Sequence, residues 1–340
     1  MATEQIKTGI LLLNFGGPWS LKEVKPFLYR VFSDPNILVK IPSPLRECLA
    51  FLIAQIKGAS SIKAYKTIGG YSPQLHWTKL QAMSLGNILN NIFFKISIGM
   101  LASSPSIGEA LAELKGWGTE QLILLPLFPQ YSTTTAGSCF KETYKQLKKL
   151  KWQPVIKEIC SWPDHPDYIS LLIQTLDEAM QKAKTEWTKD HNIPVHIIFS
   201  AHSLPLAIVK RGDPYPQEIN QTFLKLQAYC LNSLSTPCSL AFQSRNGRLP
   251  WLEPYLENEL IRLAKLGSKR LIIVPISFVS DHIETLWELD LLYSKIAQKN
   301  GIEQYIRART FNNDIKFGNL LFKILLKSLD FASTTSNEVC

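Results

Sequence analysis

Long apolar runs are missing from this chain of 340 residues. No stretch of about 18 consecutive apolar residues occurs, so the sequence predicts no membrane-spanning helix. The first residues, M-A-T-E-Q-I-K-T, lead directly into a strand-like segment, so we predict no targeting segment and a cytoplasmic protein. With 46% hydrophobic and 19% charged residues, the composition is that of an ordinary globular protein with room for two domains.

Several functional motifs are also absent. Neither the G-x-G-x-x-G fingerprint nor the G-x-x-x-x-G-K-[ST] loop occurs, which argues against a nucleotide-binding oxidoreductase. The G-x-S-x-G elbow of serine hydrolases is missing. The six cysteines include no C-x-x-C pair, so a cysteine metal site is only weakly indicated and reduced thiols are expected.

Positive charge is in excess, with 37 Lys and Arg against 28 Asp and Glu and a formal net charge of +9. The basic residues are scattered, with a local cluster at Lys145–Lys151. A solvated helix face is the simplest interpretation of this cluster. Contact with an anionic membrane surface or an anionic substrate is the alternative. No nucleic-acid-binding motif accompanies the charge, so we expect no nucleic-acid partner.

Apolar strands alternate with amphipathic helices along the chain. Strands are predicted at 9–15, 93–100, 121–126, up to Ser200, 240–243 and 271–274, and helices at 20–32, 44–57, 78–91, 106–115, 137–150, 166–189, 216–231, 252–266, 283–299 and 315–331. Such alternation is typical of parallel sheets. The sequence therefore predicts an α/β protein with two similar Rossmann-like domains, each a parallel sheet flanked by helices, and a cleft between them. The expected domains are 1–155 and 156–312, followed by a helix at 313–340 that packs back and a short tail.

A histidine follows one of the most apolar segments. The predicted strand ends at Phe199-Ser200, and A-H-S-L-P places His202 just beyond it. Ligands bind at the carboxyl ends of strands in parallel α/β proteins, and a histidine there can bind a metal ion or move protons. The alternative is a histidine whose hydrogen bonds are satisfied by the neighbouring backbone.

Carboxylates follow a second apolar strand. In the segment D-H-I-E-T-L-W-E, Asp281, Glu284 and Glu288 are spaced i, i+3 and i+7, on one face of a helix. A row of carboxylates repels itself unless cations or protons pass along it. A solvated helix N-terminus, where the dipole favours acidic residues, is the alternative. We expect Asp281, His282 and Glu284 to line one crevice with His202.

Two further segments have the composition of a ligand surface. The turn Gly69–Pro73 can offer backbone N–H groups and the Ser72 hydroxyl to an anion. The segment F-P-Q-Y-S-T-T-T-A-G combines aromatic rings with four consecutive hydroxyl residues. Ordinary turn chemistry explains both segments equally well. Trp251 belongs either to the core or to the cap of an apolar pocket.

Six ordered segments together resemble ferrochelatase, the terminal enzyme of haem synthesis. They are L-L-L-N-F-G-G-P, A-Y-K-T-I-G-G-Y-S-P, P-L-F-P-Q-Y-S-T-T-T-A-G-S, F-S-A-H-S-L-P, F-Q-S-R-N-G-R-L-P-W-L-E-P and F-V-S-D-H-I-E-T-L-W-E-L-D. The resemblance covers nearly the whole chain. It implies a chelatase fold without nucleotide, with a porphyrin in the cleft and Fe²⁺ inserted into the ring, so porphyrin and ferrous iron would be the substrates.

The resemblance also implies roles for single residues. His202 and Glu284 would be the catalytic pair and the metal ligands, facing each other across the porphyrin. Asp281 and His282 would support that site, and Glu288 would extend an acidic path. The remaining implied residues are the porphyrin contacts Phe15, Ser72, Tyr131, Ser132, Thr133, Thr134 and Trp251.

The chain departs from the family pattern near the predicted porphyrin site. Many members carry an Arg-Tyr pair just before a P-S-I segment, whereas Leu101 and Ala102 stand there in this chain. A guanidinium that would bind a propionate is therefore missing, and Lys66 or Arg248 are the candidates to replace it. The acidic path ends early, because Leu292 stands where some relatives have a carboxylate.

The cysteine pattern departs from that of animal-type members, which bind a [2Fe–2S] cluster. Those proteins use one cysteine in the hydroxyl-rich tract and three near the C-terminus. Thr133 occupies the tract position and only Cys340 is near the end, so we predict no such cluster and no tightly bound cofactor.

Two alternatives to a protoporphyrin IX ferrochelatase stay open from the sequence, and so does the oligomeric state. Coproporphyrin III is the nearest alternative substrate, although relatives that use it often have tyrosine in place of Phe15. A non-catalytic tetrapyrrole or haem carrier would account for the missing Arg-Tyr pair, but it would not need both His202 and Glu284. A monomer and a homodimer are equally compatible with the sequence.

Overall fold

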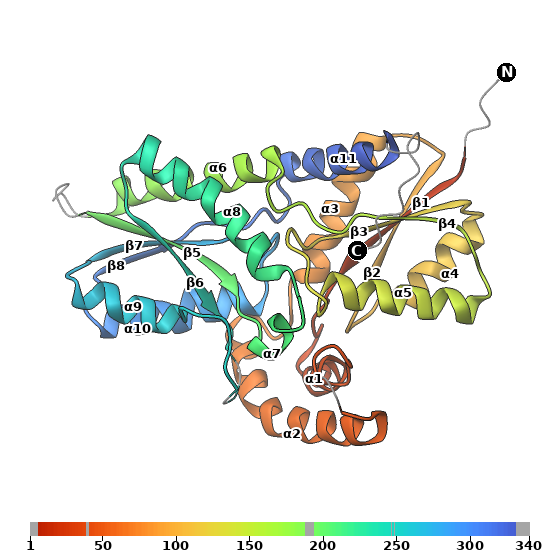
Figure 1. Cartoon of the computed structure of the whole chain (residues 1–340), viewed down its shortest axis with the longest axis horizontal. Helices are drawn as coiled ribbons and strands as arrows, with labels where there is room; N and C mark the ends of the chain where they lie inside the picture. Colours follow the sequence, from red (N-terminus) through yellow and green to blue (C-terminus); the bar gives the residue numbers. More distant parts are fainter. Residues whose placement is uncertain (1–5, 39–40, 188–193, 246, 248, 331–340) are drawn as a thin grey trace. The chain divides into compact units, whose positions relative to one another are not determined.

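The computed structural model describes residues 6–38, 41–187, 194–245, 247 and 249–330 (Figure 1). The described residues fall into two compact units. The first contains the residues up to Ser161 together with those from Asn312 onward, and the second is Trp162–Phe311.

The first unit alternates strands with helices. In chain order its described elements are β1 (Thr8–Asn14), the short 3₁₀ helix η1 (Leu21–Glu23), α1 (Val24–Phe32), α2 (Ser43–Thr67), α3 (Gln74–Leu89), β2 (Phe94–Met100), α4 (Ile107–Trp117), β3 (Gln121–Pro126), α5 (Ala136–Leu150), β4 (Val155–Glu158) and α11 (Ile315–Asp330). The strands form one parallel sheet in the order β2-β1-β3-β4. The predicted parallel sheet of this half is therefore confirmed.

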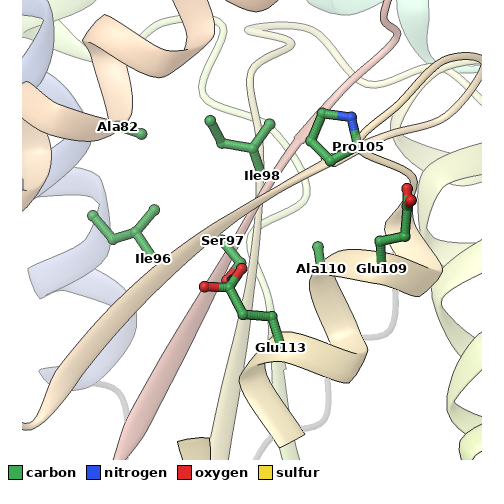
Figure 2. A pocket seen from close by; sticks show the side chains of 8 residues that line it. All are labelled: Ala82, Ile96, Ser97, Ile98, Pro105, Glu109, Ala110 and Glu113. Carbon is green, nitrogen blue, oxygen red and sulfur yellow. Dashed lines mark hydrogen bonds between the residues drawn. The ribbon is translucent and has the colours of Figure 1, made fainter. Parts of the chain in front are cut away.

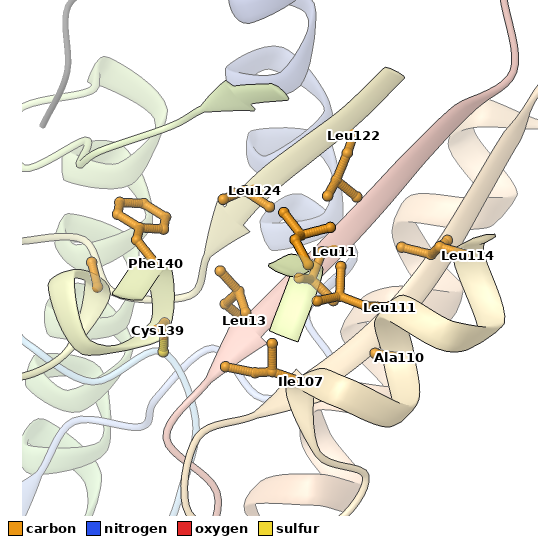
Figure 3. Packing of buried hydrophobic residues seen from close by; sticks show 12 residues of the cluster. Leu11, Leu13, Ile107, Ala110, Leu111, Leu114, Leu122, Leu124, Cys139 and Phe140 are labelled. Carbon is orange, nitrogen blue, oxygen red and sulfur yellow. The ribbon is translucent and has the colours of Figure 1, made fainter. Parts of the chain in front are cut away.

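The core of the first unit lies on both faces of β1, whose seven residues are all buried. Successive side chains of a strand point to opposite faces of the sheet. Leu11 and Leu13 pack with Leu122 and Leu124 of β3 against α4 and α5, as Figure 3 shows. Burying each such leucine contributes roughly 2 kcal/mol, so this layer is a large part of what stabilises the unit.

Helix α11 completes the first unit by packing on α3. Its apolar side is buried through Phe317, Leu320 and Leu321. The helices approach closely at Gly318, where an added Cβ would lie 2.1 Å from Ser84 Oγ and 2.9 Å from Ser84 Cβ. Only a residue without a side chain permits this approach.

The second unit repeats the same arrangement. Its described elements are α6 (Pro166–Glu186), β5 (Val195–His202), α7 (Leu206–Val209), α8 (Tyr215–Tyr229), the π-helical turn η2 (Cys230–Leu234), β6 (Cys238–Gln243), α9 (Leu256–Lys265), β7 (Arg270–Pro275), the π-helix η3 (Glu284–Tyr293), α10 (Ser294–Lys299) and β8 (Gln304–Arg307). The strands are parallel in the order β6-β5-β7-β8, which corresponds strand for strand to the first sheet. Ile198, Leu271 and Ile273 form its core with α9 and η3.

The structure corrects several element boundaries. The short strands β4 and β8 were not predicted, and α2 continues to Thr67 rather than ending at Lys57. Ser20 precedes η1 without a capping hydrogen bond from its side chain. No helix within the described ranges combines the length and hydropathy needed to cross a bilayer.

The prediction of reduced thiols is confirmed for Cys48, Cys139, Cys230 and Cys238, which are free. It is wrong for Cys160, which is disulfide-bonded. Cys340 lies outside the described residues.

Candidate functional site

The predicted catalytic residues of the second unit follow two neighbouring strands. His202 is the last residue of β5, which continues two residues beyond its predicted end at Ser200, and Asp281–Glu284 follow the carboxyl end of β7. These strands pair in parallel at the centre of the sheet. From β5 the chain continues to β6 on one side of the sheet, and from β7 it continues to β8 on the other side. Where neighbouring parallel strands are connected in opposite directions, a crevice opens at their carboxyl ends.

The protonation of His202 follows from its contacts. Its Nδ1 lies 2.6 Å from the carbonyl oxygen of Ser203, and its backbone N–H donates to Ser277 Oγ at 3.0 Å. A carbonyl can only accept, so Nδ1 carries the proton and Nε2 keeps its lone pair. Burial lowers the pKa of His202, against the opposing charge of Glu284. The imidazole is therefore a neutral base with one nitrogen available.

Glu284 lies beside a second histidine. Its Oε2 is 2.9 Å from His282 Nδ1, which also lies 3.2 Å from the Glu284 backbone N–H. Burial by itself raises the pKa of Glu284, but His282 and His202 outweigh it and lower the pKa to about 2. Nδ1 can accept the N–H or share a proton with the carboxylate, but not both at once. Glu284 is thus an ionised carboxylate with a titratable partner in contact.

Glu288 differs from Glu284 although both lie on η3. Burial, and then the charge of Glu284, raises the pKa of Glu288 to about 7. Ser244 Oγ donates to Glu288 Oε2 at 2.6 Å and Gln243 Nε2 donates to the same oxygen at 3.1 Å. Two carboxylates one turn apart therefore favour different protonation states near neutral pH.

Asp281 does not share the helix face predicted for it, because η3 begins only at Glu284 and is a π-helix. Asp281 instead binds Arg307 Nη1 at 3.1 Å and accepts the Thr285 hydroxyl at 2.9 Å. Arg307 also makes two bonds to Asp290, at 2.6 and 2.9 Å. The predicted i, i+3, i+7 row is wrong, and Asp281 fixes the start of η3 instead.

In the first unit, a buried polar network holds the end of β1. Asn14 donates from Nδ2 to Thr78 Oγ1 at 3.0 Å, while its Oδ1 accepts from Gln74 Nε2 at 3.0 Å and from the Phe15 N–H at 2.8 Å. The Phe15 ring meets the Phe27 ring edge-on at 6.4 Å between centroids. These contacts therefore hold the Phe15 backbone and ring in one position, where the chain leaves β1.

Ser72 is brought to the same strand end. Its N–H donates to the Pro18 carbonyl at 2.7 Å. A Cβ on Gly17 would lie 2.5 Å from Ser72 Cβ and Oγ, so the glycine is required for this approach. Ser72 is only 8% exposed, and its Oγ accepts from the Gln74 N–H at 3.4 Å.

The hydroxyl-rich segment after β3 divides into buried and open residues. Ser132 and Thr134 are buried with their hydroxyl oxygens 2.9 Å apart, which matches the turn interpretation for these two. Tyr131 is half-buried and Thr133 is exposed. In the second unit, Trp251 is half-buried and forms an antiparallel bridge with Pro205, three residues after His202. Porphyrin contact by these residues stays a prediction, and Arg248 lies outside the described residues.

Comparison with known proteins agrees with this arrangement. The sequence model of the ferrochelatase family matches residues 7–329. The chain belongs to the ferrochelatase family. A ferrochelatase of Aquifex aeolicus is 38% identical and covers 92% of this chain and 96% of its own length. The mitochondrial ferrochelatase of Gallus gallus is also 38% identical, covering 99% of this chain and 83% of that protein.

Solved structures support the fold of this ferrochelatase-family chain. SirB from Bacillus subtilis with Fe³⁺ aligns with a TM-score of 0.55 at 11% identity and covers 96% of this chain and 98% of its own. The sirohydrochlorin chelatase SirB from Bacillus subtilis subspecies spizizenii, in complex with cobalt, aligns with a TM-score of 0.50. At such low identity the likeness shows the chelatase fold alone.

Several residues of this ferrochelatase-family site were not found from the sequence. The Phe278 ring contacts both imidazoles, edge-on, with centroids 6.4 Å from His202 and 4.6 Å from His282. Tyr215 donates its hydroxyl to the His202 carbonyl at 2.9 Å. Arg307 ends the unpredicted strand β8. Because this strand was not predicted, the sequence offered no reason to single out the arginine at its end.

A pocket of about 280 Å³ lies elsewhere, beside the edge strand β2 (Figure 2). It is lined by Ala82 of α3, Ile96 and Ile98 of β2, and Glu109 and Glu113 of α4, among others. None of the predicted site residues lines it. Among the described residues, no group of three or more His, Cys, Asp or Glu has the geometry of a metal site.

Proposed function

We propose that this protein is a ferrochelatase that inserts Fe²⁺ into protoporphyrin IX, forms protohaem and releases two protons. The observation that carries the proposal is the group of His202, Glu284 and Glu288, whose protonation states differ in a chain of the ferrochelatase family. Fe²⁺ is a substrate here rather than a resident cofactor.

The reaction needs a metal ligand and a proton acceptor close to the ring nitrogens. Fe²⁺ must lose water ligands, and a neutral imidazole and a carboxylate are ligands that can replace them. The free Nε2 of His202 and the ionised Glu284 supply both types. The protons come from the two pyrrole N–H groups, and either His202 or Glu284 is able to accept the first of them.

Glu288 supplies the next position for a proton. With its pKa raised to about 7, it can take up and release a proton near neutral pH, whereas Glu284 stays ionised. Ser244 and Gln243 bond to its carboxylate and hold it in place. We therefore assign Glu288 to the acidic path away from Glu284, while Asp281 and His282 support the site of His202 and Glu284.

The deciding experiment is anaerobic insertion of Fe²⁺ by the purified protein, followed by loss of porphyrin fluorescence. Protoporphyrin IX and coproporphyrin III are assayed in parallel, and Phe15 favours protoporphyrin. Glu284→Gln should lose turnover while keeping most of its porphyrin affinity. Stoichiometric binding without insertion by the wild type would instead identify a tetrapyrrole carrier.

A peripheral membrane contact would bring the enzyme to an apolar substrate. Helix α2 exposes Leu45, Phe51, Leu52 and Ile56, with exposed fractions of 55–79%. Exposed apolar side chains on one helix suit the interfacial layer of a bilayer. We expect a cytoplasmic enzyme that co-sediments with phosphatidylglycerol vesicles. Ile56→Glu should weaken co-sedimentation, whereas Ile56→Leu, which keeps the apolar surface, should not.

We also propose that the enzyme holds no [2Fe–2S] cluster. Thr133 has no thiol, and Cys340 lies outside the described residues. Protein purified anaerobically should contain no acid-labile sulfide, and stoichiometric sulfide would overturn this expectation. Sedimentation velocity will distinguish a monomer from a homodimer.

A further inference from the structure

A mostly buried arginine joins the last strand of the second unit to the segment that carries Glu284. Arg307 ends β8, where it lies opposite Ile273 of β7 in the parallel register. Its side chain is only 11% exposed, although β8 is an edge strand of the sheet. A guanidinium in such a place must have its charge and its N–H donors satisfied by the protein.

Two aspartates and one carbonyl satisfy this guanidinium. Nε and Nη2 donate to the two carboxylate oxygens of Asp290, at 2.6 and 2.9 Å. Nη1 lies 3.1 Å from Asp281 Oδ1 and 3.3 Å from the Ala308 carbonyl oxygen. Asp290 lies within η3, and Asp281 lies three residues before η3 begins. The guanidinium therefore bridges two points of the chain, with Glu284 and Glu288 between them in the sequence.

The Asp281 end of this bridge reaches the Glu284 carboxylate. Asp281 Oδ1 accepts the Thr285 hydroxyl at 2.9 Å, and Thr285 Oγ1 accepts the His282 backbone N–H at 3.1 Å. Thr285 is fully buried. The His282 ring in turn lies 2.9 Å from Glu284, measured from Nδ1 to Oε2. Arg307 is thus connected to Glu284 by a continuous series of contacts within the second unit.

We propose that Arg307 is a positioning residue, which holds Glu284 in place for iron insertion by fixing the aspartates before and after it. This inference rests on the proposed function. A buried ion pair adds little net stability, because the loss of hydration offsets the attraction between the charges. What the bridge supplies is a fixed geometry, since the planar fork of a guanidinium bonds two carboxylates at once.

The test keeps the charge and removes the fork. Arg307→Lys places a single ammonium where the guanidinium bonded both aspartates, so it no longer holds them in one geometry. Removing the charge altogether would leave two carboxylates unpaired and threaten the fold. The kcat for Fe²⁺ insertion should fall roughly tenfold to a hundredfold, the scale of a misplaced reacting group. The KM and the dissociation constant for protoporphyrin IX should stay unchanged.

Hydrogen exchange read by mass spectrometry gives a readout that needs neither substrate nor turnover. In Arg307→Lys, peptides that cover residues 281–293 should exchange faster, whereas peptides from β5 and α9 should keep the protection of wild type. Asp290→Asn weakens the other end of the bridge and leaves the Asp281 pair intact. It should change kcat and exchange in the same direction, and it gives the same test if Arg307→Lys does not fold.

Arg309→Gln is the matched control on the same stretch of chain. Arg309 makes the same kind of two-bond pair with Glu178 of α6, at 2.6 and 3.1 Å. The two side chains are 38% and 44% exposed, and exposed pairs contribute little. This variant should leave both kcat and the exchange of residues 281–293 at the wild-type level.

Three results would overturn the positioning role. They are a wild-type kcat in Arg307→Lys, an equal fall of kcat in Arg309→Gln, and a loss of protection spread evenly over the second unit, which would make Arg307 a support of the fold alone. Failure of the wild type to bind or metallate any porphyrin would instead overturn the proposed function. The exchange of residues 281–293 would then still show whether Arg307 holds this segment.

Discussion

His202 shows how one backbone carbonyl decides the chemistry of a side chain. The Ser203 carbonyl fixes the proton on Nδ1, and burial keeps the ring neutral. Tyr215 and Ser277 hold the backbone on either side through the His202 carbonyl and N–H. The ring is therefore oriented by contacts that do not involve Nε2, which leaves that nitrogen for iron or a proton.

His202→Ala should abolish iron insertion without unfolding the protein. The backbone bonds that hold this strand end do not involve the imidazole, so the fold does not depend on it. Metal insertion and thermal unfolding are measured on the same preparation. Full insertion activity in the variant would remove His202 from the mechanism.

Glu288 should make the stability of the enzyme depend on pH. A pKa raised from 4.5 to about 7 means that the folded state holds a proton which the unfolded state has lost. Stability from this group is thus present below about pH 4.5 and is lost as pH rises through about 7. Between pH 5 and 8, Glu288→Gln should gain roughly 2 kcal/mol relative to wild type. Urea unfolding of both proteins at pH 5 and at pH 8 measures the two free energies of unfolding. The same difference between variant and wild type at both pH values would contradict the prediction.

Site residues could be predicted where they directly follow an apolar strand pattern in the sequence. His202 and Glu284 follow apolar runs, so their place at strand ends could be expected. Arg307 could not be found in this way, because its partner Asp281 is 26 positions away. Pairs that are so far apart in the sequence depend on how helices and strands pack together. The periodicity of apolar residues along the chain carries no information on that packing.

At the scale of elements, the close approach of α11 to α3 is set by one residue. Gly318→Ala should cost stability, because the new Cβ would overlap both heavy atoms of the Ser84 side chain. Gly116→Ala is the matched control, since it lies near the end of α4 with nothing within 4 Å. Alanine favours a helix over glycine by about 1 kcal/mol at either position.

The two variants should therefore move in opposite directions in thermal denaturation. Gly116→Ala should melt slightly above wild type, and Gly318→Ala should melt several degrees below the control, the effect of roughly 1–3 kcal/mol of overpacking. Equal melting temperatures would mean that Ser84 rearranges without cost.

Elements with a clear apolar pattern were predicted best. The strand at Gln121–Pro126 has the predicted bounds, whereas β4 and β8, with four residues each and mixed polarity, were missed. Helix α2 continues through Gly58, where an added Cβ would lie 2.8 Å from side-chain carbons of Lys25 on α1. The π-helix η3 has no distinct periodicity in so short a segment, and Arg307 of β8 contacts both Asp290 on this helix and Asp281 before it.

At the scale of the whole molecule, each unit has its own sheet and its own core. Leu111 of α4 and Leu260 of α9 are fully buried in the two separate clusters. Each leucine-to-alanine change should cost about 2–5 kcal/mol in its own unit. Hydrogen exchange read by mass spectrometry should show lost protection only in the unit that carries the substitution. Equal loss in both units would mean that they unfold as one cooperative body.

The chain path of the first unit has a consequence for synthesis on the ribosome. Its last helix, α11, follows the whole of the second unit in the sequence. Domains generally fold as they emerge, N-terminal first. Here the earlier half must wait, with the α3 surface uncovered, until some 150 later residues have been translated. The second unit, which carries His202 and Glu284, is thus complete before the first. A chaperone that binds apolar helix surfaces would bind this protein at α3 during that time.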